Sequence, residues 1–365
     1  MKNDHVPEFQ AIQPAEWAPH QSVWLAWPTH ADLWQENLEA AQIEFTALCR
    51  AIADVDPQST QARGESLNIL AFDAAAERTA ARALQGLPVR FHRIPFGDIW
   101  LRDTAPIFVA RADGRIESHR FGFNGWGGKY ALPYDAEVSA RVAQAADLPG
   151  RAFSWILEGG SIEVDGQGTA LTSRQCLLNT NRNPGMNQAQ IEAALGESLG
   201  IAKVLWLGDG LLNDHTDGHI DTIARFTAPG VVMCMKAADA ADPNFEIMNQ
   251  IEADLRSFTD ARGRRLEVVT VPSPGELLNA DGEVMPASYL NFYIGNTTVV
   301  VPTYAQSADA EAVAQIAGAF PGRRTVGLSA RAILSGGGAF HCITQQQPMP
   351  QSPRLQPPVT QGARS

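Results

Sequence analysis

The chain has 365 residues, of which 45% are hydrophobic and 19% are charged, a balance typical of a globular protein with a sizeable core. Its net charge of -12 argues against nucleic-acid binding, because phosphates attract clusters of Lys and Arg and the chain has no basic run of five or more residues. The acidic balance suits a cationic small molecule, although many soluble proteins carry a similar charge.

Cysteine usage and hydropathy indicate the compartment. Cys49, Cys176, Cys234 and Cys342 are scattered without a Cys-x-x-Cys pair, which favours a reducing compartment over a disulfide scaffold or a zinc site. Residues 1–9 are polar and show no secretory signal. No stretch approaches the roughly 20 apolar residues that span a bilayer. The sequence therefore predicts a cytoplasmic protein without membrane contact.

Six helices are predicted from apolar spacing and capping signals. Residues 38–52 carry apolar side chains at helical spacing. Asp73 is the predicted N-cap of a helix that ends near Gly86, and Asn187 with Gln190 is a predicted capping box. The remaining helices are expected to begin at Asp135, at Pro243 after an Asp242 cap, and at Ser307.

Short apolar runs between these helices are predicted strands, at residues 67–71, 176–179, 204–207, 231–235, 266–271 and 297–302. Five predicted helix starts, at 73, 135, 187, 243 and 307, recur at spacings of 52 to 64 residues. This quasi-repeat of strands and one helix predicts a closed, radially repeated α/β architecture. A doubly wound sheet, which also alternates strands and helices, is the competing interpretation.

Two polar motifs lie in the first half of the chain. Residues 98–106 place Asp98, Trp100, Arg102 and Asp103 directly before an apolar strand, and residues 157–160 place Glu158 before two glycines. Taken alone, the first motif is typical of a surface Arg–Asp pair and the second of a solvated glutamate in a turn.

A third motif, residues 213–221, gathers two histidines and three aspartates, including His219 and Asp221. These residue types could bind a metal. However, no cysteine or further histidine completes a recognisable site, and the glycine between the histidines predicts a loop. A metal site is therefore the minority interpretation.

The fourth motif, residues 334–346, carries Cys342 after three glycines and His341. Glycine lets a backbone approach a bound molecule closely, so Gly337 and Gly338 are candidate substrate-binding residues. An arbitrary free cysteine most often serves as a small buried hydrophobe. The separate Asp, Glu and His motifs favour a functional role for this one.

Together the motifs fit a cysteine nucleophile that acts on a guanidinium group. A thiol with the ordinary pKa of about 8.5 needs a neighbouring base or cation to form the thiolate, and His219 can supply it and then carry protons. Carboxylates bind a guanidinium through paired, charge-assisted hydrogen bonds. Asp103 and Asp221 are the predicted pair, with Glu158 as a third acid.

At these residues the chain resembles the agmatine deiminase family, one of the guanidine-modifying enzymes together with bacterial peptidylarginine deiminases and arginine deiminases. The resemblance rests on motifs that follow in order over about 330 residues, namely 14–20 with 24–28, 100–103, 123–130, 158–160, 218–221 and 336–346. It implies a five-bladed α/β propeller, the pentein fold. It also implies hydrolysis of agmatine to N-carbamoylputrescine and ammonia, without metal or organic cofactor, on a route to putrescine.

By the same resemblance, Cys342 is the expected nucleophile and His219 the general acid and base. Asp103 and Asp221 would hold the guanidinium nitrogens, and Glu158 would support the guanidinium and His219. Trp100, Asp98 and Trp126 are candidates for contact with the amine end of the substrate. Three positions depart from the family pattern, Gly97, Ala105 and Ala339. Ala339 and Phe340 stand beside the expected nucleophile, so substrate preference is the property most affected.

Several alternatives stay open at this point. The chain could act on peptidylarginine or another small guanidine, transfer the amidino group to an amine, or bind guanidines without catalysis. A metallohydrolase that uses His215, His219 and the neighbouring aspartates is the most distant alternative. Residues 1–348 are predicted to form a single catalytic propeller domain, and 349–365, rich in Pro and Gln, a disordered tail. Proteins of this kind are often dimers, so a homodimer is expected.

Overall fold

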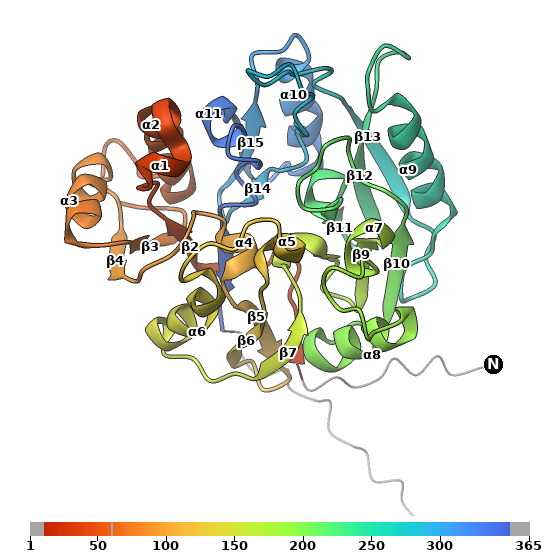
Figure 1. Cartoon of the computed structure of the whole chain (residues 1–365), viewed down its shortest axis with the longest axis horizontal. Helices are drawn as coiled ribbons and strands as arrows, with labels where there is room; N and C mark the ends of the chain where they lie inside the picture. Colours follow the sequence, from red (N-terminus) through yellow and green to blue (C-terminus); the bar gives the residue numbers. More distant parts are fainter. Residues whose placement is uncertain (1–10, 60, 351–365) are drawn as a thin grey trace, which may run out of the picture.

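The computed structural model describes residues 11–59 and 61–350. Its strands form five small sheets that follow one another around a ring in sequence order (Figure 1). This arrangement confirms the closed, radially repeated α/β architecture, and the doubly wound alternative is wrong.

Each sheet has three or four strands. The first contains β17 (Gln345–Pro348), β2 (His20–Ala26), β3 (Ser66–Ala71) and β4 (Val89–Arg93); the second contains β1 (Ala11–Ile12), β5 (Ile107–Arg111), β6 (Ile116–Gly122) and β7 (Ala152–Ile156). The others contain β8 (Glu163–Val164), β9 (Thr169–Ser173) and β10 (Lys203–Leu207); β11 (Ala224–Ala228), β12 (Val231–Lys236) and β13 (Glu267–Pro272); and β14 (Tyr293–Ile294), β15 (Thr298–Thr303) and β16 (Arg324–Ser329).

All five sheets share one plan, an antiparallel pair followed by a parallel pair. A parallel pair needs a crossover connection, and a helix supplies it in every sheet. These crossover helices are α2 (Leu38–Ala53), α6 (Asp135–Ala146), α8 (Gln188–Leu199), α9 (Phe245–Ser257) and α10 (Asp309–Ala319). The predicted repeat counted the helix after Asp73 as its first member. That helix, α3 (Ala74–Ala83), leads instead to the additional strand β4, and α2 holds the repeated position.

Local capping chemistry explains where the sequence predicted elements well and where it did not. The Asp73 cap and the Asn187–Gln190 capping box are both present. The predicted strand 176–179 is wrong, because the Ser173 hydroxyl accepts from the Cys176 N–H and starts a short helix, α7 (Arg174–Leu177). The helix expected from Pro243 begins at Phe245, since the Asp242 carboxylate closes a turn onto the Asn244 N–H instead.

The last strand closes the ring. β17 pairs antiparallel with β2, near the start of the chain, and the Trp24 indole N–H donates to Gln347 Oε1 at 2.9 Å. Further short helical turns connect the strands. They are α1 (Ala31–Trp34), η1 (Gln35–Asn37), α4 (Leu101–Thr104), α5 (Gly125–Gly128), η2 (Gly159–Ser161), η3 (Ile220–Thr222) and α11 (Arg331–Leu334). Figure 1 shows α4 and α5 close to the centre of the ring.

None of the helices in the described part of the chain is both long and apolar enough to cross a membrane. The single catalytic domain over 1–348 stays a prediction. Nearly all of the predicted tail, 349–365, lies outside the described residues; within them, the Met349 N–H donates to the Pro19 carbonyl at 2.8 Å.

Candidate active site

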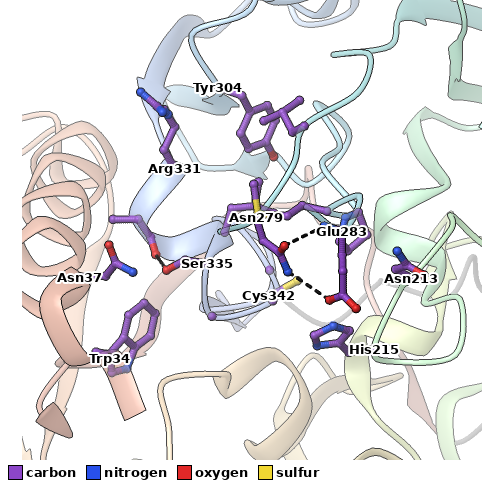
Figure 2. Close-up of a pocket in the computed structure, with 18 of the residues that line it drawn as sticks. Trp34, Asn37, Asn213, His215, Asn279, Glu283, Tyr304, Arg331, Ser335 and Cys342 are labelled. Atoms are coloured by element: carbon purple, nitrogen blue, oxygen red, sulfur yellow. Dashed lines mark hydrogen bonds between the residues drawn. The ribbon is translucent and has the colours of Figure 1, made fainter. Parts of the chain in front are cut away.

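A cavity of about 1080 Å³ opens among the short helical turns, and Cys342 lies on its wall (Figure 2). Asp98, Trp100, Asp103 and Trp126 line the same cavity, as do Gly337 and Gly338. A large concave pocket with converging polar groups is the usual setting of a small-molecule site. Of the residues predicted from sequence, these seven therefore share one surface.

The Cys342 thiol is 8% exposed and has polar neighbours on several sides. The Asn291 amide donates to Sγ at 3.1 Å, and Asp221 Oδ2 lies 3.5 Å from it. Burial, followed by the nearby Asp221 and Asp103 carboxylates, raises the pKa of Cys342 well above its usual range, although the Ala339 N–H and Asn291 oppose the shift. Without a ligand, the site therefore holds the protonated thiol.

Asp103, Asp221 and His219 converge on one point beside Gly160. A Cβ atom placed on Gly160 would lie 2.7 Å from His219 Nδ1, 2.9 Å from Asp103 Oδ1 and 3.2 Å from Asp221 Oδ2. Only a residue without a side chain lets these three groups approach the backbone so closely. Three motifs that are far apart in the sequence thus meet next to the thiol.

The Asp103 carboxylate is held by two donors, the Gly160 N–H at 2.9 Å and the Trp126 indole N–H at 2.8 Å. Burial, together with the charges of Asp221 and Glu158, raises the pKa of Asp103 to about 8. Two close carboxylates repel each other, so one of them stays protonated near neutral pH until a cation enters.

His219 is 1% exposed, and neither ring nitrogen has a hydrogen-bond partner among the described residues. Its Nδ1 lies 3.8 Å from Asp103 Oδ2. Burial lowers the pKa of His219 to about 3, although Asp221 opposes the shift. The imidazole is therefore neutral, and both of its nitrogens are available to a ligand or to water.

His341 links the site to the first residues of the described chain. Its Nδ1 lies 2.7 Å from Asp221 Oδ2, and its Nε2 lies 2.8 Å from Glu16 Oε2. Arg225 donates to Glu16 at 2.8 Å and to Glu163 at 3.0 Å. Burial favours a higher pKa for Asp221, but the contacts with His341 outweigh it and lower this pKa, so Asp221 carries the negative charge of the site.

Glu158 is fully buried and faces a cation that sequence reasoning missed. Arg182 Nε lies 2.9 and 3.0 Å from the two Glu158 oxygens, and Arg182 also donates to Asp217 at 2.7 Å. One Glu158 oxygen, one His219 ring nitrogen and the Cys176 sulfur lie within 4.8 Å of one another. Glu158 thus lies behind His219, and Arg182 balances its charge.

The residues 213–221 do not direct their side chains to a shared metal position. His215 Nδ1 contacts the Tyr130 hydroxyl at 3.0 Å, whereas Asp214 accepts from the N–H groups of Thr216 and His219. Among the described residues, the group with metal-ligand spacing is Glu158, Cys176 and His219, and Arg182 already contacts that glutamate. The donor set that sequence reasoning considered, with His215 and His219 together, is not assembled.

Sequence reasoning missed four residues that shape the site, namely Glu16, Arg182, Asn291 and Trp34. Glu16 lies in a motif that carried the family resemblance, residues 14–20, but had no chemical signal of its own. The other three stand outside every polar motif. Their partners come from distant segments, so only the folded chain reveals them.

Comparison with known proteins agrees with this geometry. Residues 12–348 match the family described as Porphyromonas-type peptidyl-arginine deiminase. The chain is 38% identical over 361 residues to an agmatine deiminase of Stutzerimonas stutzeri, covering 92% of this chain and 95% of the relative. It is 37% identical over 360 residues to an agmatine deiminase of Pseudomonas putida, with coverages of 92% and 95%.

Solved structures show the same likeness. The structure of an Enterococcus faecalis agmatine deiminase superposes with a TM-score of 0.86 at 32% identity, covering 93% of this chain and 96% of that one. A dimethylarginine dimethylaminohydrolase superposes with a TM-score of 0.51 at 12% identity, covering 90% and 99% of the two chains, which bears on the fold alone.

Proposed function

The chain belongs to the Porphyromonas-type peptidyl-arginine deiminase family, and we propose that it hydrolyses agmatine to N-carbamoylputrescine and ammonia. One observation carries this proposal. Asp103, Asp221 and His219 converge around Gly160, and Asp221 also contacts the Cys342 thiol. A planar cation placed there meets two carboxylates, a neutral imidazole and a sulfur nucleophile together.

The guanidinium group binds between Asp103 and Asp221. One oxygen of each carboxylate lies near Gly160, and paired N–H donors on a guanidinium match such acceptors. The bound cation removes the repulsion between the two acids and lowers the pKa of the neighbouring thiol. Substrate binding and nucleophile activation are thus coupled through the same charges.

In the first half-reaction, the Cys342 thiol gives its proton to His219 as the thiolate forms and attacks the central guanidinium carbon. A C–S bond forms, and the tetrahedral intermediate then loses ammonia as His219 returns the proton to the leaving nitrogen. The product of this step is a covalent amidino-thioether on Cys342. The Ala339 N–H and the Asn291 amide stabilise the thiolate before attack.

In the second half-reaction, His219 takes a proton from water, and the resulting hydroxide attacks the same carbon. Cleavage of the C–S bond releases N-carbamoylputrescine, and the thiol regains its proton. Glu158 supports this cycle from behind His219, with Arg182 as its counter-ion. We expect this product to be used on a route to putrescine. A cytoplasmic location and a homodimeric assembly remain predictions.

Ammonia release from agmatine, arginine and a blocked peptidylarginine, measured in parallel, tests the proposal. Release from agmatine in preference to the other two, lost in Cys342→Ala and kept in Cys234→Ala, is the expected result. Cys234 is a suitable control because it is buried in a separate part of the core, on β12. Preference for peptidylarginine would leave the proposed mechanism in place and show that the substrate is wrong. Ammonia release that survives Cys342→Ala would overturn the mechanism.

A further inference from the structure

Two tryptophans form a continuous wall of the cavity. The rings of Trp34 and Trp100 stack with centroids 6.1 Å apart and an interplanar angle of 28°. Both line the cavity that contains Cys342, and Figure 2 shows Trp34 directed toward it from the first blade. Trp34 belongs to no polar motif, so nothing in the sequence distinguished it.

One carboxylate fixes both indoles. Trp34 Nε1 donates to Asp98 Oδ1 at 3.0 Å, and Trp100 Nε1 donates to Asp98 Oδ2 at 2.8 Å. Asp98 also accepts from the Ile99 N–H at 2.8 Å. Both carboxylate oxygens are therefore already in use, so Asp98 is better suited to orienting the rings than to binding an amine itself.

Distances from the glycine loop before Cys342 show which of the two indole rings lies nearer to the thiol. A Cβ atom on Gly338 would lie 3.0 Å from Cys342 Sγ and 2.8 Å from Trp100, and one on Gly336 would lie 2.9 Å from both Trp100 and Trp34. Trp100 is thus next to the nucleophile, and Trp34 is one ring farther away. A chain that extends from a guanidinium at Cys342 passes Trp100 before it reaches Trp34.

The backbone beside Trp34 is unusual. Gln35, the next residue, has φ 48 and ψ -128, a region that non-glycine residues rarely occupy. Such strain persists only where the surroundings impose it, and it is frequent at ligand-binding positions. Gln35 also lines the cavity, so the strained turn and the indole belong to the same wall.

We propose that Trp34 is the specificity-determining residue for the distal ammonium group of the substrate, with Trp100 along its methylene chain and Asp98 as the positioning residue. The inference rests on the proposed function, because it takes the guanidinium to be bound beside Cys342. Tryptophan is the aromatic residue that attracts cations best, and donation of its N–H to a carboxylate makes the ring more electron-rich. The wall therefore selects guanidines with a second positive charge over uncharged analogues.

The test compares agmatine with butylguanidine, which keeps the chain and lacks the amine. For Trp34→Leu we expect KM for agmatine to rise about tenfold with kcat within about twofold, and KM for butylguanidine to change by less than about twofold. Trp34→Phe should give an intermediate increase for agmatine, because a benzene ring attracts cations less strongly. Trp155→Leu, at a half-buried tryptophan that packs in a different core cluster, is the matched control and should leave the ratio of the two substrates unchanged.

Asp98→Asn has its own expected result. An amide oxygen can accept from only one of the two indoles in the same place, so one ring loses its orientation. KM for agmatine should rise with kcat retained, and the preference for agmatine over butylguanidine should fall. A variant that merely unfolded would lose activity on both substrates equally, and a thermal melt would show its lower stability.

Two results would overturn the inference, namely an equal change for both substrates in Trp34→Leu or no change for either. Calorimetry with the Cys342→Ala protein separates this inference from the proposed function, since binding needs no turnover. If agmatine binds more weakly after Trp34→Leu but the wild type does not hydrolyse it, the Trp34 assignment stands and the deiminase assignment is wrong. If agmatine does not bind at all, both assignments are wrong.

Discussion

The Sγ atom of Cys342 lies 3.5 Å from Oδ2 of Asp221, so the proposed nucleophile rests against a buried negative charge. Asp221 keeps that charge because His341 contacts the same oxygen at 2.7 Å. Such a neighbour disfavours the thiolate until a cation lies between the two acids. We therefore expect the resting thiol to be unreactive toward neutral electrophiles and to become reactive in the presence of a suitably shaped cation.

This relationship predicts how Cys342 responds to alkylating reagents. Chloroacetamidine, a planar cation, should modify Cys342 at least about tenfold faster than neutral chloroacetamide, because it pairs with Asp103 and Asp221 and stabilises the thiolate. Intact-mass measurements would follow the single adduct. Cys342→Ala should abolish it, since Cys49, Cys176 and Cys234 are all 0% exposed. Equal rates for the two reagents would contradict the coupling.

Binding of agmatine should release a proton from Asp103, whose pKa is raised to about 8, first by burial and then by Asp221 and Glu158. The bound guanidinium requires the ionised carboxylate, so affinity should increase about tenfold per pH unit below pH 8 and level off above it. His219, with its pKa lowered to about 3, does not titrate in this window.

Calorimetry of the Cys342→Ala protein at pH 7, in two buffers of different ionisation enthalpy, would measure this proton. Release of close to one proton is expected, and Asp103→Asn should remove it. An affinity that stays flat between pH 6 and pH 8 would show that Asp103 is already ionised in the free protein.

Gly160→Ala should remove activity without unfolding the protein. The added methyl group would lie 2.7 Å from His219 Nδ1 and 2.9 Å from Asp103 Oδ1, so both side chains would have to move. Displacement of these two groups is expected to lower kcat/KM at least about 100-fold. Gly208→Ala is the matched control, because no heavy atom lies within 4 Å of its added Cβ, and it should stay within about twofold.

Arg182→Gln should destabilise the fold by about 3–5 kcal/mol, since it leaves the fully buried Glu158 carboxylate without its counter-ion. The double variant Glu158→Gln with Arg182→Gln should recover part of this loss, because no buried charge then remains unpaired. Urea unfolding of the two single variants and the double variant measures the coupling. Strictly additive losses would mean that the pair contributes nothing as a pair.

The fold could be predicted because local signals in the sequence mark its repeat. Caps at Asp73 and Asn187 depend on hydrogen bonds within a few residues, and apolar spacing marks the crossover helices. Prediction failed where one local signal opposed another or where an element was added to the repeat. The helix α7 replaced a predicted strand because the Ser173 hydroxyl caps it, and α3 was counted in the repeat although it leads to the added strand β4.

The candidate site shows a similar division. Cys342, His219, Asp103 and Asp221 stand in short motifs with several polar residues, and the structure brings them together. Trp34 and Asn291 have no such context, because each reaches the site through a contact with a segment more than 50 residues away. A single sequence does not state which distant residues will meet, so these partners required the structure.

Ring closure by β17 also sets a condition on synthesis. Cys342 stands three residues before β17, which pairs with β2, and His341 contacts Glu16 across almost the whole chain. As the polypeptide leaves the ribosome, the second to fifth sheets and most of the first emerge before the thiol does. We therefore expect the proposed nucleophile to be held against its acids, and chemistry to begin, only after the final strand has joined the first sheet.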